Sequence, residues 1–310
     1  MERVYHYTTM EAFLHLIESV KDSSDKKSFV FRATNIFFMN DPQEFTFGQC
    51  VLMKVLEEIE NDKNVDRELR LSSLFEKYKG KSEEEWLGQI RETIHNHKES
   101  PYIISFSRNK DSLPMWLNYG DKGYGVCLAF AEYHNNSIDF QNKEIDQISI
   151  ELFDSLGTFD VNYGYDIINN KENLIYKNLC YMHEYYLNKV KQIVSPKELS
   201  ELQIGMLKGL SIVNAPYVKR KEYQGEKEVR LAKTIFSENM ENASEIKFRC
   251  NMKGHIIPYI SVEIPTKQLE YVMTGPLVNK DLSIRAIEMM KKKYDLNFDV
   301  KGSNINYRDY

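Results

Sequence analysis

Three charged residues at alternate positions form the stretch of this sequence that is best suited to chemistry. Glu226, Glu228 and Arg230 lie just before an apolar run. If the segment is a strand, residues two apart share a face, so both carboxylates and the guanidinium project together while the residues between them point into the core. A carboxylate in such a site can move a proton or stabilise a positive charge. The same spacing is also typical of the wet face of an ordinary strand.

A histidine near the N-terminus is a second candidate. The segment RVYHYT, ending at Thr8, predicts a short strand with His6 and Thr8 on one face. Thr8 and Glu11 have the spacing of a capping box, which would start a helix directly after this strand. His6 would then lie beside a helix N-terminus, where backbone donors and anions often meet. A single histidine in this position is also commonly structural.

Two serines and two aromatic residues follow in the middle of the chain. Residues 102–107 are the clearest predicted strand, with Ser105 and Ser107 on one face. These hydroxyls could hold a ribose or form only local hydrogen bonds. A short helix follows, with Trp116 and Tyr119 three residues apart on one side. Aromatic residues at this spacing usually belong to a core.

The segment NDPQE at residues 40–44 predicts the start of a helix. Asp41 would be the N-cap, Pro42 would occupy the first helical position and Glu44 would complete the capping box. A capping role is the simplest interpretation of these three residues.

Helical patterns gather in two parts of the chain. They occupy about residues 45–98 and 166–214, whereas strand patterns dominate elsewhere. No linker, low-complexity tract or internal repeat divides the 310 residues. We therefore predict a single domain over residues 1–310, of the α+β class, with two helical insertions.

The charge balance gives no overall attraction to nucleic acid or to an anionic membrane. The chain has 41 Lys and Arg against 46 Asp and Glu, a formal net charge of −5. A local basic groove remains compatible with this balance, and the run Lys219–Lys221 is expected to be a solvated face. The sequence has no run of about twenty apolar residues and no signal peptide, so we expect a cytoplasmic protein without membrane contact.

The cysteines do not suggest a metal site or a redox pair. Cys50, Cys127, Cys180 and Cys250 lie far apart in the sequence. We expect them to be reduced, buried thiols. No cluster of His and Asp residues has the spacing of metal ligands, so we expect no metal.

With these pieces in order, the chain resembles the bacterial domain-of-unknown-function family twenty-nine seventy-one. The resemblance covers most of the chain outside the two helical insertions. Its matching pieces are Tyr5–Thr8, Met39–Glu44, Ile104–Ser107, Met115–Tyr119 with Gly125, Glu226–Arg230, the Gly275–Pro276 turn and Ser303–Arg308.

That family is in turn similar to ADP-ribosyltransferases, including the DarT-type toxins. The resemblance implies a split β-sheet core of the ADP-ribosyltransferase type, with NAD as substrate. By this resemblance His6 would hold the adenosine-side ribose, and Ser105 and Ser107 would support the nicotinamide-side ribose. Tyr119 or Trp116 would stack on the nicotinamide ring.

The same resemblance assigns the catalytic roles to the two acids. Cleavage of the bond between nicotinamide and ribose develops positive charge on the sugar, which Glu228 would stabilise. Glu226 would act as a general base or position the nucleophile. The pyrophosphate would be held by the helix start at Thr8, beside Tyr7, or by Arg230. No glycine-rich dinucleotide fingerprint is present, so NAD would not bind as it does in a Rossmann fold.

These features favour an NAD-dependent ADP-ribosyltransferase, such as a toxin or anti-phage effector, whose macromolecular acceptor could be nucleic acid or protein. One alternative is a non-catalytic ligand-sensing or interaction module, in which Glu226, Glu228 and Arg230 form only an ion-pair network. Another is a metal-independent RNase with His6 and Glu228 as general acid and base. The acidic net charge argues against the RNase.

Overall fold

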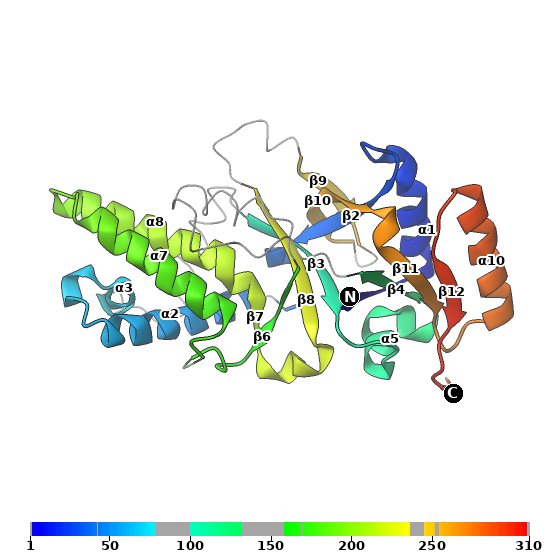
Figure 1. Ribbon diagram of the computed structural model, residues 1–310, viewed down its shortest axis with the longest axis horizontal. Helices are drawn as coiled ribbons and strands as arrows, with labels where there is room; N and C mark the ends of the chain where they lie inside the picture. The colour runs from blue at the N-terminus through cyan, green and yellow to red at the C-terminus, as the bar shows by residue number, and fades with distance from the viewer. Residues whose placement is uncertain are drawn as a thin grey trace.

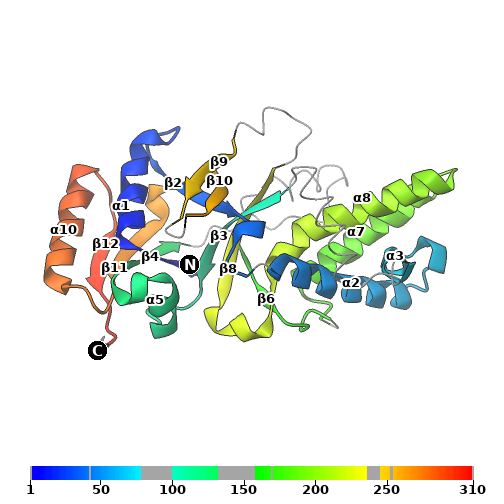
Figure 2. The same ribbon diagram turned by 180° about the vertical axis from the view of Figure 1, so that it is seen from behind.

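The computed structural model describes residues 2–41, 43–77, 100–131, 158–168, 170–235, 245–251 and 254–308. It confirms the α+β class. A largely antiparallel ten-stranded sheet forms the centre, with helices at both ends (Figures 1 and 2). In the parts of the chain described, no helix has the length and apolar character needed to cross a bilayer.

The sheet runs in the order β12-β11-β4-β1-β3-β2-β10-β9, and β8 pairs with both β3 and β5. Its one parallel pair among the described strands is β11 with β12. The strands are β1 (Arg3–Thr8), β2 (Ser28–Asn35), β3 (Ser100–Ser107), β4 (Val126–Ala131), β5 (Thr158–Asp160), β8 (Glu228–Ile235), β9 (Lys247–Cys250), β10 (Ile256–Pro265), β11 (Leu269–Thr274) and β12 (Asp299–Gly302).

The sheet divides at β3. One edge of β3 pairs with β8 along its whole length, from Ser100 to Ser107. The opposite edge pairs with β1 only at Ser107 and with β2 only at Tyr102 and Ile103. Because β1 and β2 meet β3 at opposite ends, they diverge and leave the middle of this edge without a strand partner.

Alternating apolar residues build the main core beneath the sheet. Phe13 and Ile17 of α1 (Met10–Glu18) pack there with Phe106 of β3, Phe130 of β4 and Ile287 of α10 (Lys280–Lys293). All five side chains are buried. Removing such apolar surface from water is the main favourable term in folding, so this core fixes the positions of β1 and β3 relative to each other.

The predicted capping box at Thr8 is wrong by one residue. Thr9 is the N-cap of α1, and its hydroxyl accepts a hydrogen bond from the Ala12 amide at 3.1 Å. Thr8 instead ends β1, where it pairs with Val126. Because its backbone belongs to the sheet ladder, the helix can begin only after it. Glu11 then occupies the second helical position and cannot complete the box.

The helices predicted as insertions project from one end of the sheet (Figure 1). They are α2 (Glu44–Asp62) and α3 (Leu71–Lys77) in the first range and α7 (Leu174–Val190) and α8 (Pro196–Asn214) in the second. Residues 78–98 of the first range lie outside the described part. Leu56 of α2 and Leu210 of α8 belong to one separate buried cluster, so the two insertions share a core.

Short elements connect the larger ones. They are the strands β6 (Asn162–Tyr163) and β7 (Val218–Lys219), the helix α5 (Leu113–Tyr119), and the 3₁₀ turns η1 (Ser19–Asp22), η2 (Ile36–Phe38), η3 (Arg67–Leu69), η4 (Asp121–Gly123), η5 (Ala215–Tyr217), η6 (Lys221–Glu226) and η7 (Thr266–Gln268).

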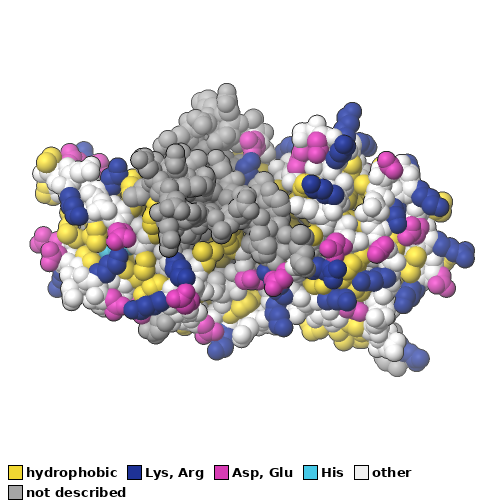
Figure 3. Space-filling view, viewed as in Figure 1, with side chains coloured by type: hydrophobic (Ala, Val, Ile, Leu, Met, Phe, Trp, Pro, Cys, Tyr) yellow, Lys and Arg dark blue, Asp and Glu magenta, His cyan; other side chains and the backbone are white. Residues whose placement is uncertain are grey.

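The charged side chains on the face in Figure 3 are mixed in sign. Basic side chains (Lys and Arg, dark blue) and acidic ones (Asp and Glu, magenta) are interspersed on it rather than gathered into separate patches.

Candidate functional site

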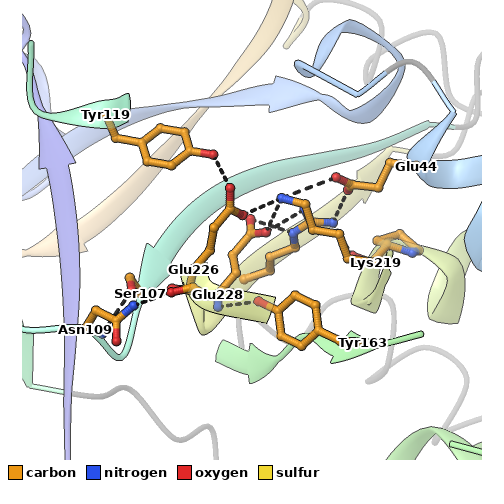
Figure 4. Close-up of polar contacts among 11 residues, drawn as sticks. Glu44, Ser107, Asn109, Tyr119, Tyr163, Lys219, Glu226 and Glu228 are labelled. Carbon is orange, nitrogen blue, oxygen red and sulfur yellow. Dashed lines mark hydrogen bonds and ion pairs between the residues drawn. The ribbon is translucent and has the colours of Figure 1, made fainter. Parts of the chain in front are cut away.

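Five charged residues meet at the start of β8. Three are the carboxylates Glu44, Glu226 and Glu228, and two are the cations Lys219 and Arg230 (Figure 4). Each of the three carboxylates lies within ion-pair distance of at least one cation. Burying charges is costly unless they are paired, so the group holds together as a unit.

The pair of Glu228 and Arg230 is the most deeply buried part of this cluster. The Arg230 Nε and Nη2 atoms donate to the two Glu228 carboxylate oxygens at 2.8 and 2.9 Å. Its Nη1 atom donates to the Pro216 carbonyl and lies 2.5 Å from Glu44 Oε1. The predicted alternation on β8 is therefore correct for these two residues. However, the Arg230 side chain is fully buried and does not line the cleft, so it holds Glu228 rather than a pyrophosphate.

Lys219 joins all three carboxylates. Its Nζ atom donates to Glu226 at 2.7 Å and to Glu228 at 3.0 Å, and it lies 3.6 Å from Glu44. The prediction of a solvated lysine run is wrong at this position, because only 7% of the Lys219 side chain is exposed. Lys219 pairs with Tyr163 of β6, and this pairing places its side chain next to Glu228 at the start of β8. No local sequence signal indicates this position.

Glu226 reaches the cluster from a turn and not from a strand. It ends the 3₁₀ turn η6, and Lys227 follows in a left-handed conformation with φ 43°, so β8 begins only at Glu228. Its carboxylate accepts a hydrogen bond of 2.5 Å from the Tyr119 hydroxyl. The prediction of an extended segment through Glu226 is therefore wrong, although the two acids still come together.

Ser107 supports this turn instead of facing a ligand. Its hydroxyl donates to the Glu226 carbonyl at 2.5 Å and accepts from the Asn109 amide at 2.9 Å. The Asn109 side chain donates to the Gly225 carbonyl at 2.7 Å. Since Ser107 is fully buried and absent from the lining of the cleft, its predicted ribose contact is not available in this structure.

Glu44, like Lys219, is a residue of the charged cluster that the sequence did not predict as part of the site. The N-cap of α2 is Gln43, which makes no side-chain capping bond, and Glu44 points instead to Arg230 and Lys219. Asp41 accepts a hydrogen bond from the Gln43 amide at 2.9 Å, whereas Pro42 lies outside the described residues. The capping role predicted for Glu44 is wrong because two buried cations 175 or more positions later attract it, and a capping motif cannot report them.

The charges set the protonation states of the site. Burial by itself raises the pKa of Glu228, but the charges of Arg230 and Lys219 more than offset this and bring it to about 2. Burial lowers the pKa of Lys219, yet the attraction of Glu228 leaves it raised. Burial and the bond to Glu226 raise the pKa of Tyr119. At neutral pH the site therefore holds an ionised Glu228, a charged Lys219 and a neutral Tyr119 hydroxyl.

A cleft of about 840 Å³ opens where β1 and β2 diverge. Of the residues predicted from the sequence, it is lined by His6, Tyr7, Thr8, Ser105, Tyr119, Glu226 and Glu228. The structure thus brings to one cavity residues from β1, β3, α5, η6 and β8. Ser107, Trp116 and Arg230 do not line it.

Trp116 supports the site from behind. Its side chain is fully buried and meets the Tyr7 ring edge to face at 4.9 Å. Its indole nitrogen donates to Asp111 Oδ1 at 2.8 Å. The expected stacking of Trp116 on a ligand ring is not possible in this position, and its role is to hold α5, which carries Tyr119.

His6 fills the gap in the divided sheet. Its Nδ1 atom lies 2.9 Å from the Ser105 carbonyl, in the part of the β3 edge that neither β1 nor β2 pairs. A carbonyl only accepts, so Nδ1 carries the proton and Nε2 is left as an acceptor. Phe31 and Phe106 meet the ring edge to face. Burial lowers the pKa of His6, which favours the neutral imidazole.

Within the described ranges, no group of three His, Cys, Asp or Glu residues is placed to hold a metal ion. All four cysteines are free. Cys127 is buried, Cys50 and Cys180 are half-buried, and Cys250 is exposed, so the expectation of buried thiols is wrong for Cys250.

A family model described as "Protein of unknown function (DUF2971)" matches residues 115–231. The matched span contains Tyr119, Lys219, Glu226, Glu228 and Arg230, which are most of the charged cluster with its hydroxyl donor. No curated protein and no solved structure matches the chain.

Proposed function

The chain belongs to the family of proteins of unknown function DUF2971, and from the site itself we propose that it is an NAD-dependent ADP-ribosyltransferase. One observation carries this proposal. His6, Ser105, Tyr119, Glu226 and Glu228 come from five separate elements and line one cleft. The division of the sheet at β3 supports a split-sheet core of the ADP-ribosyltransferase type, with the ligand between its two halves.

Glu228 is suited to stabilise a sugar cation. In the reaction, the bond between the ribose anomeric carbon and nicotinamide breaks, its electron pair leaves with nicotinamide, and positive charge develops on the ribose. With a pKa of about 2, Glu228 stays ionised throughout. Arg230 fixes the orientation of the carboxylate through two hydrogen bonds, so little reorganisation is needed as the charge develops.

Glu226 is better placed to act on the acceptor. It is more exposed than Glu228, with 15% of its side chain accessible against 6%. When the nucleophile of the acceptor forms its bond to the anomeric carbon it must lose a proton, and Glu226 would receive that proton or position the nucleophile. The Tyr119 hydroxyl and Lys219 hold the Glu226 carboxylate in place. The acceptor is a nucleic acid or a protein.

The test compares wild-type protein with Glu228→Gln. Each is incubated with radiolabelled NAD and candidate acceptors, and both label transfer and nicotinamide release are measured. We expect the substitution to lower the rate by about 10²- to 10³-fold, as removal of one charge-stabilising contact does. Glu288→Gln, on α10, is the matched control and should retain full activity. Transfer by Glu228→Gln at the wild-type rate, or no turnover by wild-type protein with any acceptor, would contradict the proposal.

The proposed biological setting is that of a toxin or an anti-phage effector. Depletion of NAD or modification of an essential macromolecule would stop growth. Expression of wild-type protein in bacterial cells should therefore reduce colony counts, whereas Glu228→Gln should not. Equal colony counts for both proteins, at equal expression, would argue against this role.

A second candidate is a non-catalytic binding module on the same fold. It is favoured by the pairing within the charged cluster, in which Arg230 and Lys219 already engage both oxygens of Glu228. This alternative predicts that Glu228→Gln lowers stability and changes no reaction. An RNase is less consistent with the site, because a carboxylate with a pKa of about 2 is a weak general base at neutral pH.

A further inference from the structure

A second group of charged side chains lines the far half of the same cleft. Arg32 of β2 lies opposite Ser261 of β10, and Lys247 and Arg249 of β9 lie opposite other residues of β10. Directly paired residues of antiparallel strands point to the same face. The register and the alternation along each strand therefore place the three cations on one face of β2, β10 and β9. All three side chains line the cleft.

Within the described part of the chain, no acid forms an ion pair with these three cations. In the described residues their contacts are with neutral groups: Lys247 donates to the Ser261 hydroxyl at 2.9 Å, and Arg249 Nη2 donates to the Thr34 hydroxyl at 3.3 Å. The Arg32 guanidinium lies 5.5 Å from the centre of the Tyr259 ring. This differs from the other end of the cleft, where every cation is paired with carboxylates.

Among the described strand residues, Glu263 of β10 is the acid on this face that lines the cleft, and it is engaged elsewhere. Glu263 pairs in register with Val30, and its carboxylate accepts hydrogen bonds from the Ser24 amide and hydroxyl at 2.8 and 2.6 Å. Two hydrogen bonds fix this carboxylate on the loop before β2. As far as the described ranges extend, the positive charges of Arg32, Lys247 and Arg249 therefore remain available to an incoming ligand.

Arg249 carries a buried donor without an acceptor. Its Nε atom is shielded from solvent and finds no hydrogen-bond partner among the residues that the structure describes. Burial, together with the positive charge of Arg32 nearby, lowers the pKa of Arg249. An unpaired buried donor and a like-charge neighbour are both unfavourable. A bound anion would relieve both, because a guanidinium presents its N–H groups in the geometry that phosphate oxygens match.

We propose that Arg32, Lys247 and Arg249 form a subsite for the diphosphate group of a nucleotide. The cleft is acidic at Glu226 and Glu228 and basic at this subsite. A dinucleotide such as NAD has matching charges, with a cationic nicotinamide ring and an anionic diphosphate. The choice of a dinucleotide rests on the proposed function, whereas the phosphate subsite rests on its own residues.

A small phosphate compound fits this subsite better than a nucleic acid strand. Only three cations contribute, and they line a recess of a protein whose net charge is −5. Polymer binding would use a longer basic stripe. The whole cleft, of which the subsite is one end, has a volume of about 840 Å³.

Titration calorimetry tests the subsite directly. ADP-ribose, adenosine and a single-stranded oligonucleotide are titrated into wild-type protein, Arg249→Gln and Arg32→Gln. Lys197→Gln, an exposed lysine on α8, is the control. We expect each arginine substitution to weaken ADP-ribose binding by about 10- to 100-fold, the loss of a charge-assisted hydrogen bond. Adenosine binding should not change, and added salt should weaken ADP-ribose binding.

Three results would overturn the subsite. They are an Arg249→Gln variant that binds ADP-ribose as wild type does, adenosine binding as tight as ADP-ribose binding, and oligonucleotide binding that depends on the arginines when ADP-ribose binding does not. Arg32 is exposed, so Arg32→Gln keeps the test valid if Arg249→Gln does not fold. Because ADP-ribose lacks nicotinamide and undergoes no transfer, its binding is measured independently of any NAD turnover. Binding without turnover would keep the subsite and reject the transferase.

Discussion

Replacing Glu228 by Gln removes the negative charge at the centre of the buried cluster. The pKa of Glu228 is about 2 in the folded protein, against an ordinary value of 4.5. At 1.36 kcal/mol for each pH unit between the two values, ionised Glu228 stabilises the folded state by about 3 kcal/mol at pH 7. A loss of this size agrees with the about 3–5 kcal/mol that removal of one partner of a buried ion pair usually costs.

The stabilisation by Glu228 should depend on pH in a defined direction. Because the folded pKa lies below the unfolded one, the stabilisation is complete above about pH 4.5 and is lost as the pH falls toward 2. Urea unfolding of wild type and Glu228→Gln should therefore differ by about 3 kcal/mol at pH 7 and by progressively less at pH 4 and pH 3. Glu288→Gln removes a half-exposed partner of Lys291, so it should change stability by less than about 0.5 kcal/mol.

Two results would refute this reasoning. If Glu228→Gln is as stable as wild type at pH 7, the contacts with Arg230 and Lys219 contribute no net stability. If it is less stable by the same amount at pH 7 and pH 3, the loss arises from packing and not from charge. In either case Glu228 would not be a carboxylate held ionised by its two cations.

Two further predictions concern the supports of the site. Tyr119→Phe removes the hydroxyl that donates to Glu226, and should lower the free energy of unfolding by about 1–3 kcal/mol in urea titrations; no loss would mean that Lys219 alone holds Glu226. Gly125→Ala places a Cβ atom 2.1 Å from the Thr8 carbonyl, against backbone on both sides, and should cost at least about 2 kcal/mol or prevent folding. Gly205→Ala, within α8 and with nothing within 4 Å, should instead raise the melting temperature, with a gain of up to about 1 kcal/mol. Equal behaviour of the two glycine variants would contradict the close approach at Gly125.

Local patterns were enough to predict most elements that position the site. The alternation around Ser105 predicts β3, the residues 113–119 predict α5, and the apolar spacing in residues 174–214 predicts two paired helices. Each of these signals lies within a few turns of helix or one strand. The register of Glu228 and Arg230 on one face of β8 was predicted in the same way, since side-chain direction along a strand follows from its period of two.

The errors arose where a distant segment decides the local structure. Thr8 is not a cap because its backbone pairs with Val126 of β4. Glu44 is not a capping residue because Arg230 and Lys219 attract its carboxylate. Lys219 is not solvated because the adjoining carboxylates bury it. For Thr8 and Glu44 the competing partner is more than a hundred positions away in the sequence. Two partners of Lys219, Glu226 and Glu228, are near in sequence, but only the fold of β7 and η6 brings their carboxylates onto it.

The sequence by itself therefore determined most of the elements and which side chains share a face within each strand, because backbone geometry fixes both over a few residues. Only the tertiary structure decided which charges are paired and which remain available. Glu228 and Arg249 both look like polar residues on a half-buried strand. The fold gives Glu228 two cations at hydrogen-bond distance. It gives Arg249 a like charge and a buried Nε atom that is unpaired among the described residues. The energy of a buried charge depends on such neighbours, which only the packing of distant segments provides.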